Sequence, residues 1–266
     1  MTVLDVRLIK CRSAASASRL PGLDMAVNPY RGCGHSCAYC YAQDVTRFET
    51  GRPWGSVVEV KVNIVPRLRK ELERGLKGVY GVGTVTDPYQ PLEAEHQLTR
   101  GCLSMLKRFD AEASVLTKSD LVLRDVDVLR SWDSVEVGVS VGCADDHIAS
   151  IIEPGAPPPK ARFEALSALA DAGVEVYLMA APIIPGLSDS SSQLRTLAEL
   201  AADAHVERII WDRWNVKPIA SSRLGAALEG ASMSGEWRKG ANAASRIRAE
   251  LAGLCKSKGI DLVDAF

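Results

Sequence analysis

The sequence predicts an α/β fold, a partial (β/α)6 barrel of the TIM type. Short β-branched runs alternate with helical stretches along most of the chain, which is the pattern of a parallel sheet with crossover helices. Six such strand–helix units can be counted, and a length of 266 residues suits one large α/β domain. A doubly wound sheet would show the same alternation, but no glycine-rich dinucleotide fingerprint follows the first strand.

Charge and hydropathy restrict the class of protein further. The chain has 32 basic and 33 acidic residues and a net charge of −1, so no overall field attracts it to nucleic acid or to an anionic membrane. No run of about 18 apolar residues is present that would cross a bilayer. We therefore expect a cytoplasmic protein without a membrane partner.

The N-terminal residues 1–22 are expected to form an extension outside the barrel. Residues Val3–Lys10 alternate as a short edge strand does, and the small polar run Ser13–Ser18 indicates a flexible link. Leu23–Pro29 is then the first inner strand. It ends at a cysteine-rich segment, so these cysteines are expected at the carboxyl end of a strand, where α/β barrels build their active sites.

The barrel is expected to span residues 23–215, and a helical segment, 216–266, to pack on it. Val57–Ile64 is expected to form a strand outside the barrel. The later inner strands are expected at Val79–Thr86, Ser114–Lys118, Val135–Val141, Val174–Ala180 and Arg208–Trp211. Helices are expected at Val65–Arg74, Glu93–Phe109, Lys160–Ala172, Ser190–Ala204 with Ser190 as N-cap, and Ala241–Lys258.

Three cysteines, Cys33, Cys37 and Cys40, lie within eight residues of one another. Soft thiolates select zinc, copper(I) or iron–sulfur clusters, and this spacing lets one short loop bind three corners of a cubane cluster. A fourth protein ligand is not evident. A [4Fe-4S] cluster held by three cysteines keeps one iron open to an exogenous ligand.

Two other interpretations of the cysteines are weaker. A structural zinc site would need His35 as its fourth ligand, but structural zinc sites usually pair their ligands in two separated halves. A disulfide framework is disfavoured by the odd total of seven cysteines and by the lack of a secretory signal.

The cysteine segment resembles the radical S-adenosylmethionine (radical SAM) superfamily, because Tyr39 precedes the last cysteine of a Cys-x3-Cys-x2-Cys motif. Asn28–Cys33 and Cys40–Ala42 resemble the spore photoproduct lyase-like branch. The resemblance implies a partial (β/α)6 barrel, a [4Fe-4S] cluster, SAM, and an electron donor such as ferredoxin or flavodoxin. The implied reaction is reductive cleavage of SAM to methionine and a 5′-deoxyadenosyl radical, which abstracts hydrogen from a substrate.

The resemblance also implies binding residues for SAM at the ends of the strands. Thr86 and Asp87, in Thr-Asp-Pro-Tyr-Gln-Pro, match the segment that binds the methionyl ammonium, whose N–H donors need acceptor oxygens. A strand-to-turn cap is the alternative interpretation of that segment. Lys118 and Ser140 resemble the residues that bind the SAM carboxylate, and a buried lysine needs such an anion.

Two further residues complete the SAM site that the resemblance implies. Ile183 lies in the apolar segment Pro182–Gly186, which is similar to the segment beside the adenine and is expected just after the fifth inner strand. Tyr39 is placed to offer backbone groups to the same ring.

The substrate stays open at this point. Spore photoproduct lyase acts on a thymine dimer in DNA and returns a hydrogen atom from a cysteine at the end of the second inner strand, but Gly83–Thr86 contains no cysteine. Cys143, just beyond Ser140, is the candidate catalytic thiol. The alternatives are an enzyme that modifies RNA or peptide, a small-molecule substrate, or a metal-binding protein without catalysis. Trp211–Asn215 either lines the substrate mouth or packs in the core.

Overall fold

The computed structural model describes residues 4–233, 237 and 240–265. Its main sheet has eight strands in the order β11-β10-β9-β8-β7-β6-β3-β2. Neighbours from β3 to β11 pair in parallel, and β2 is antiparallel to β3. The strands are β2 (Ala15–Ala17), β3 (Met25–Val27), β6 (Val79–Val82), β7 (Glu112–Thr117), β8 (Val135–Ser140), β9 (Glu175–Ile183), β10 (Arg208–Arg213) and β11 (Asp261–Asp264).

This sheet is an open barrel. Its edge strands β2 and β11 do not pair with each other, so the described residues form no closed barrel. The six strands β3, β6, β7, β8, β9 and β10 are the six inner strands that the sequence predicts, and they lie side by side in chain order. The partial (β/α)6 barrel is therefore confirmed, while β2 and β11 are additions that the sequence did not indicate.

A second, three-stranded sheet lies beside the barrel in the order β1-β5-β4. It contains β1 (Asp5–Ile9), β4 (Tyr30–Arg31) and β5 (Val57–Lys61), so the Val57 strand lies outside the barrel as expected. Val3, the first residue of the predicted edge strand, lies outside the described residues.

The expected flexible link at Ser13–Ser18 is wrong, because this segment contains β2. The carboxylate of Glu71 accepts hydrogen bonds from the backbone N–H groups of Ala14 and Ala15, at 2.9 and 3.0 Å. These bonds fix the start of β2 against α2.

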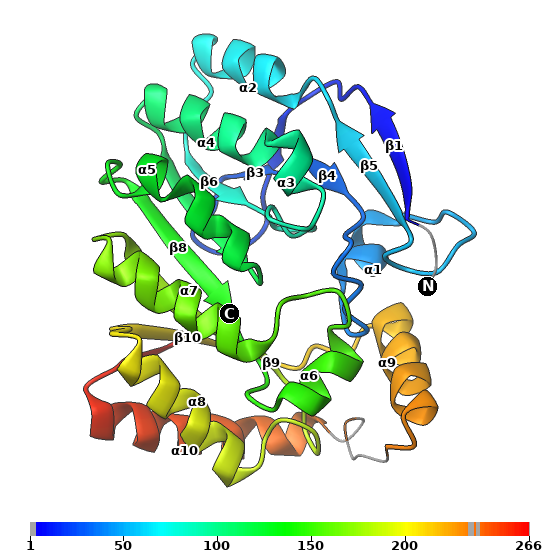
Figure 1. Cartoon of the computed structure of the whole chain (residues 1–266), viewed down its shortest axis with the longest axis vertical. Coiled ribbons are helices and arrows are strands. Elements are labelled where there is room, and N and C mark those ends of the chain that lie inside the picture. The colour runs from blue at the N-terminus through cyan, green and yellow to red at the C-terminus, as the bar shows by residue number, and fades with distance from the viewer. Residues whose placement is uncertain (1–3, 234–236, 238–239, 266) are drawn as a thin grey trace.

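The helices pack around the outside of the sheet, and α9 lies beside α1 and α6 (Figure 1). Ser190 caps α8 as predicted, with its Oγ accepting from Gln193 N at 3.3 Å. The helices are α1 (Ala42–Thr46), α2 (Ile64–Glu73), α3 (Glu93–His96), α4 (Leu98–Arg108), α5 (Val126–Leu129), α6 (Asp146–Ile152), α7 (Pro159–Asp171), α8 (Ser191–Asp203), α9 (Pro218–Gly230) and α10 (Gly240–Lys258), with a 3₁₀ helix at Asp120–Asp125.

The predicted single helix Glu93–Phe109 is wrong. The chain breaks it into α3 and α4 at Gln97, whose φ of +50° is left-handed. The buried carboxylate of Glu93 accepts from the N–H groups of Thr99 and Arg100, at 3.0 and 3.2 Å. The side chain thereby satisfies N–H groups that the first turn of α4 leaves free, a role that a helical periodicity does not reveal.

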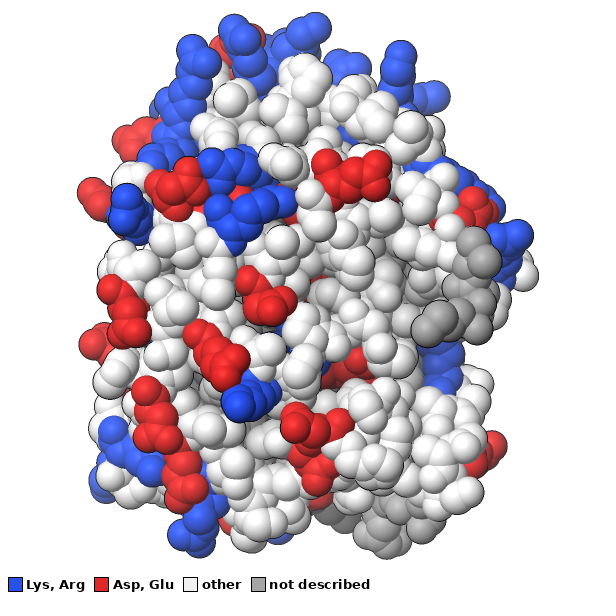
Figure 2. Space-filling view, viewed as in Figure 1, with Lys and Arg blue, Asp and Glu red and all other residues white. Residues whose placement is uncertain are grey.

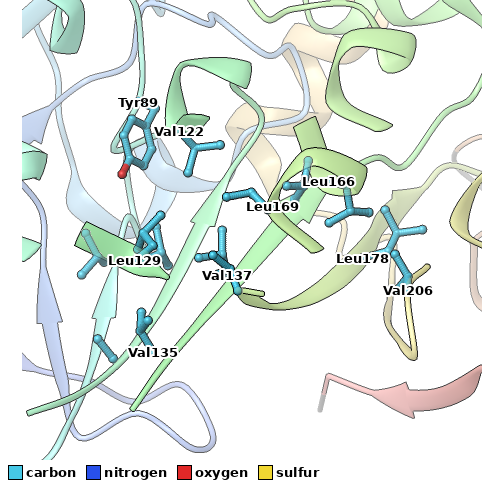
Figure 3. Packing of buried hydrophobic residues seen from close by; sticks show 14 of the residues in the cluster. Tyr89, Val122, Leu129, Val135, Val137, Leu166, Leu169, Leu178 and Val206 are labelled. Atoms are coloured by element: carbon cyan, nitrogen blue, oxygen red, sulfur yellow. The ribbon is translucent and has the colours of Figure 1, made fainter. Parts of the chain in front are cut away.

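The main apolar core lies between the sheet and the covering helices (Figure 3). Val137 of β8 and Leu166 of α7 are both fully buried in it. Truncating such a side chain to alanine typically costs about 2–5 kcal/mol for leucine.

Two polar contacts join barrel strands near their amino ends. The Tyr177 hydroxyl lies 3.3 Å from Ser114 Oγ, and Arg208 pairs with Glu136 at 2.5 Å. Charges of both signs are mixed over much of the surface in view, with Lys and Arg gathered at the α2 end (Figure 2). No helix of the described residues is long and apolar enough to cross a membrane.

Candidate functional site

The cysteine loop, residues 32–41, joins β4 to α1 beyond the carboxyl end of β3. Its three thiols are free; Cys33 and Cys37 are buried and Cys40 is half-buried. Two turns shape the loop, with Ser36 N donating to Cys33 O and Cys40 N to Cys37 O, both at 3.2 Å. Gly32 is required at the entry, because its φ is +83° and a Cβ there would lie 2.4 Å from a neighbouring carbonyl oxygen.

The segment after β6 holds this loop in place. Thr86 Oγ1 donates to Gly32 O at 2.6 Å and accepts from Gln90 Nε2 at 3.0 Å. Gln90 Oε1 in turn accepts from Gly34 N at 2.8 Å. The Thr86 hydroxyl, predicted to bind the SAM ammonium, is thus already engaged with the cysteine loop.

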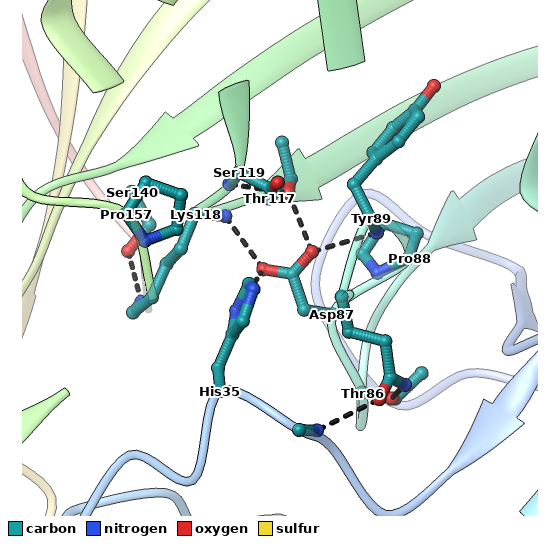
Figure 4. Close-up of polar contacts among 12 residues, drawn as sticks. His35, Thr86, Asp87, Pro88, Tyr89, Thr117, Lys118, Ser119, Ser140 and Pro157 are labelled. Carbon is teal, nitrogen blue, oxygen red and sulfur yellow. Dashed lines mark hydrogen bonds and ion pairs between the residues drawn. The ribbon is translucent and has the colours of Figure 1, made fainter. Parts of the chain in front are cut away.

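Asp87 lies at the centre of a second set of contacts (Figure 4). Its carboxylate accepts from Tyr89 N, Thr117 Oγ1 and Lys118 N at 2.6–2.9 Å. His35 Nδ1 lies 3.3 Å from Asp87 Oδ2. Burial raises the pKa of Asp87, but the His35 ring and these hydrogen bonds outweigh it and lower the pKa to about 2.

His35 therefore faces Asp87, which does not support its assignment as a zinc ligand. Among the described residues, no group of three His, Cys, Asp or Glu side chains is arranged to hold a single metal ion. Cluster-bound cysteines need no such convergence, because each sulfur binds a different iron.

Lys118 and Ser140 meet at the ends of neighbouring strands. Lys118 Nζ donates to Ser140 Oγ at 2.6 Å (Figure 4). The same Nζ lies 5.7 Å from the centre of the Tyr39 ring. Burial lowers the pKa of Lys118. The structure thus brings these three predicted residues together beside the cysteine loop.

A buried ion pair lies behind this lysine. Glu153, which follows α6, accepts a hydrogen bond from the Tyr39 hydroxyl and pairs with Arg162 Nη2 at 2.5 Å. The same carboxylate lies 3.8 Å from Lys118 Nζ. Lys118 and Arg162 thus share the carboxylate of Glu153, and Asp87, which accepts from Lys118 N at 2.7 Å, supplies a second carboxylate beside Lys118.

Sequence reasoning missed Glu153 and Arg162. Each is nearly fully buried, at 3% and 1% exposure, yet neither belongs to a recognisable motif. Gln90 belongs to the motif Thr-Asp-Pro-Tyr-Gln-Pro, which the resemblance had already singled out. Its contact with the cysteine loop is a role that this motif could have indicated.

Ile183 and Cys143 belong to different apolar clusters. Ile183 is the last residue of β9, not a residue after the strand as predicted, and it packs in the main core. Its neighbour Ile184 shares a smaller apolar cluster with Cys37, Tyr39 and Cys143. Trp214 of the expected substrate mouth belongs to that cluster too, while Trp211 packs in the main core.

The environment of the cysteines fits a cationic cluster. Burial is the largest cause that raises the pKa of each of Cys33, Cys37 and Cys40. The carboxylates of Asp87 and Glu153 raise the pKa values of Cys33 and Cys37 further. Thiols with raised pKa values become thiolates when a strong cationic partner binds them, and iron supplies one.

Fold and site together define an enzyme of the radical SAM class. The family model of the radical SAM superfamily matches residues 27–200, and the chain belongs to this superfamily. Membership implies an iron–sulfur cluster and SAM as cofactors.

Among its relatives is protein MJ0683 of Methanocaldococcus jannaschii, 37% identical over 188 residues that cover 70% of each chain. Protein Rv2578c of Mycobacterium tuberculosis is 34% identical over 207 residues, which cover 73% of this chain and 61% of that one.

Solved structures show the same fold at low sequence identity. Spore photoproduct lyase complexed with dinucleoside spore photoproduct matches with a TM-score of 0.72 and 15% identity, over 98% of this chain and 82% of that one. Streptococcus suis SuiB bound to S-adenosylmethionine matches with a TM-score of 0.58 and 10% identity, over 99% of this chain and 50% of that one.

Proposed function

We propose that Cys33, Cys37 and Cys40 hold a [4Fe-4S] cluster and that the enzyme reductively cleaves SAM to abstract hydrogen from a substrate. When bound and reduced, the cluster supplies the one electron that splits SAM into methionine and a 5′-deoxyadenosyl radical. The chain's own residues bind SAM, orient it and exclude water.

The observation that carries this proposal is the placement of Lys118 against the cysteine loop. The Lys118 ammonium, 2.6 Å from Ser140 Oγ and close to the Tyr39 ring, offers a carboxylate a charged donor next to the cluster ligands. Ser140 Oγ donates to Ala181 O at 3.1 Å and would have to turn from it to donate to the carboxylate. The nearest carboxylate of the protein, on Glu153, lies 3.8 Å from the buried Lys118 Nζ, so a bound carboxylate could approach this ammonium more closely. Charge-assisted hydrogen bonds of this kind are among the strongest in proteins.

The SAM ammonium remains assigned to Thr86 and Asp87, as the resemblance implies. Asp87 keeps its negative charge at all ordinary pH values because its pKa is about 2. Its oxygens are already used by the protein, so they would attract the ammonium through charge more than through free lone pairs. The adenine is assigned to the apolar side of the site, to Tyr39 and to the segment that contains Ile183.

Cys143 is our candidate for the thiol that returns a hydrogen atom. Its Sγ lies 3.6 Å from both Asp145 O and Gln193 Oε1, and burial raises its pKa to about 11, so the S–H bond persists at neutral pH. Transfer of that hydrogen to a substrate radical would break the S–H bond, form a C–H bond and leave a thiyl radical on Cys143. One electron from the electron donor, such as a ferredoxin or flavodoxin, and one proton from solvent would then restore the thiol.

Two classes of substrate are considered for this proposed enzyme. A lyase acting on DNA lesions is one version, and modification of RNA or of a peptide is the other. The lack of a cysteine in Gly83–Thr86 counts against the first version, and the net charge of −1 counts against binding of duplex DNA.

The test is anaerobic reconstitution with iron and sulfide, followed by reduction in the presence of SAM. Formation of 5′-deoxyadenosine together with about four irons per chain would support the proposal. A protein that binds iron as a single ion and forms no 5′-deoxyadenosine would refute it.

A further inference from the structure

Helix α9 is tied to the cysteine loop by one arginine. Arg223 donates through Nε to Ala38 O at 3.3 Å, through Nη1 to Gln43 Oε1 at 2.6 Å, and through Nη2 to Cys40 O. One guanidinium thus holds the backbone on both sides of Tyr39. Its rigid planar fork is the geometry for which arginine, unlike lysine, is suited.

A residue just after the cysteine loop also binds α9. Asp44 of α1, four residues after Cys40, accepts from the N–H groups of Ile219 and Ala220 at 3.0 and 3.1 Å. These are N–H groups of the first turn of α9, and a carboxylate there also interacts favourably with the helix dipole. Asp44 therefore caps the start of α9, while Arg223 of α9 binds backbone carbonyls of the cysteine loop.

Apolar packing closes the same interface. Leu224 and Leu228 of α9 are almost fully buried and share a cluster with Cys37, Ala38 and Tyr39. The Arg223 guanidinium also lies 5.0 Å from the centre of the Trp54 ring. In Figure 1, α9 accordingly lies against α1 and α6, although it lies beyond the residues that the family model matches.

We propose that Arg223 is a positioning residue for the cluster, which fixes the Cys37–Cys40 turn and places a permanent positive charge beside it. This inference rests on the proposed function, since it presumes that the three cysteines bind a cluster. Reduction adds negative charge to the cluster, so a nearby cation favours the reduced form and raises the reduction potential. Helix α9 is in this sense part of the cluster site.

The experiment compares Arg223→Met, Arg223→Lys and Asp44→Asn in the full chain after reconstitution. The readouts are the reduction potential, from a titration followed by EPR, and the rate at which a chelator removes iron. Arg223→Met should shift the potential to a more negative value and speed iron loss roughly tenfold. Arg223→Lys keeps the charge and should keep the potential near that of the parent, while iron loss still speeds up.

Asp44→Asn should shift the reduction potential in the direction opposite to Arg223→Met. It removes a negative charge from the same interface, so the potential should become more positive, while the weakened cap of α9 speeds iron loss. Arg246→Met is the matched control. Arg246 donates from α10 to Asp189 O at 3.1 Å, so its loss should lower thermal stability without moving the potential.

The outcomes separate this inference from the proposed function. A parent protein that takes up no cluster would overturn both. A parent that takes up the cluster while Arg223→Met matches it in potential and in iron loss would overturn the role of Arg223 alone. If Arg223→Met does not fold, the other two variants decide. An unchanged potential in Asp44→Asn together with unchanged iron loss in Arg223→Lys would then overturn the role of Arg223.

Discussion

Lys118 and Ser140 approach to 2.6 Å, although 22 residues separate them in the sequence. The register of β7 and β8, which pairs Thr117 with Val139, brings the two strand ends level. We predict that Lys118→Ala weakens SAM binding roughly ten- to a hundredfold, because a charge-assisted hydrogen bond is lost, without removing iron. Equilibrium binding of SAM to the reconstituted protein measures this. Lys160→Ala, at an exposed lysine of α7, is the control, and equal affinities in both variants would refute the assignment.

The ligand set is predicted to be Cys33, Cys37 and Cys40 alone. Alanine at any one of them should abolish the [4Fe-4S] signal. Cys102→Ala and Cys255→Ala should leave it intact, since both thiols lie in the main core. Iron and sulfide content with EPR spectroscopy measures the signal, and loss of the cluster from either core variant would show that the ligand set is wrong.

Asp87 should stabilise the chain in a pH-dependent way. A pKa lowered from 3.8 to about 2 corresponds to roughly 2 kcal/mol of folding free energy. Because the folded pKa is the lower one, this stabilisation is complete above about pH 4 and is lost as the pH falls through about 2. Urea unfolding of the cluster-free protein should therefore show Asp87→Asn to be less stable than the parent at pH 7, with the difference shrinking below pH 4. Asp120→Asn, at an exposed carboxylate, should match the parent at every pH.

Cys143 provides a test of the hydrogen-return step. Because Gly83–Thr86 has no thiol, dinucleotide spore photoproduct should not be repaired to two thymines at a useful rate, even where 5′-deoxyadenosine forms. Chromatography of the products measures both reactions. Efficient repair that persists in Cys143→Ala would contradict the argument from the missing hydrogen donor, whereas cleavage of SAM without repair would direct the substrate search to RNA, peptides or small molecules.

The sequence by itself determined the six inner strands and the cysteine loop, because both depend on residues that are close together in the chain. The βα alternation indicated six inner strands because a buried parallel strand needs an apolar β-branched run whatever lies far away in the chain. The cysteine spacing indicated one metal-binding loop for a similar reason, since three ligands within eight residues are brought together by the loop itself. Lys118 and Ser140 were identifiable through the resemblance and their positions at strand ends.

Long-range packing decided the rest. The capping of α4 by Glu93, the Glu153–Arg162 pair behind Lys118, and the contact between Arg223 and Cys40 all join residues whose partners the chain supplies from another element. Arg223 and Cys40 are 183 residues apart, and nothing in the local pattern of either segment reports the other. A buried charge is stable only where the fold brings a counter-charge or hydrogen-bonding partner to it, so which charges are buried, and against what, is fixed by the tertiary structure.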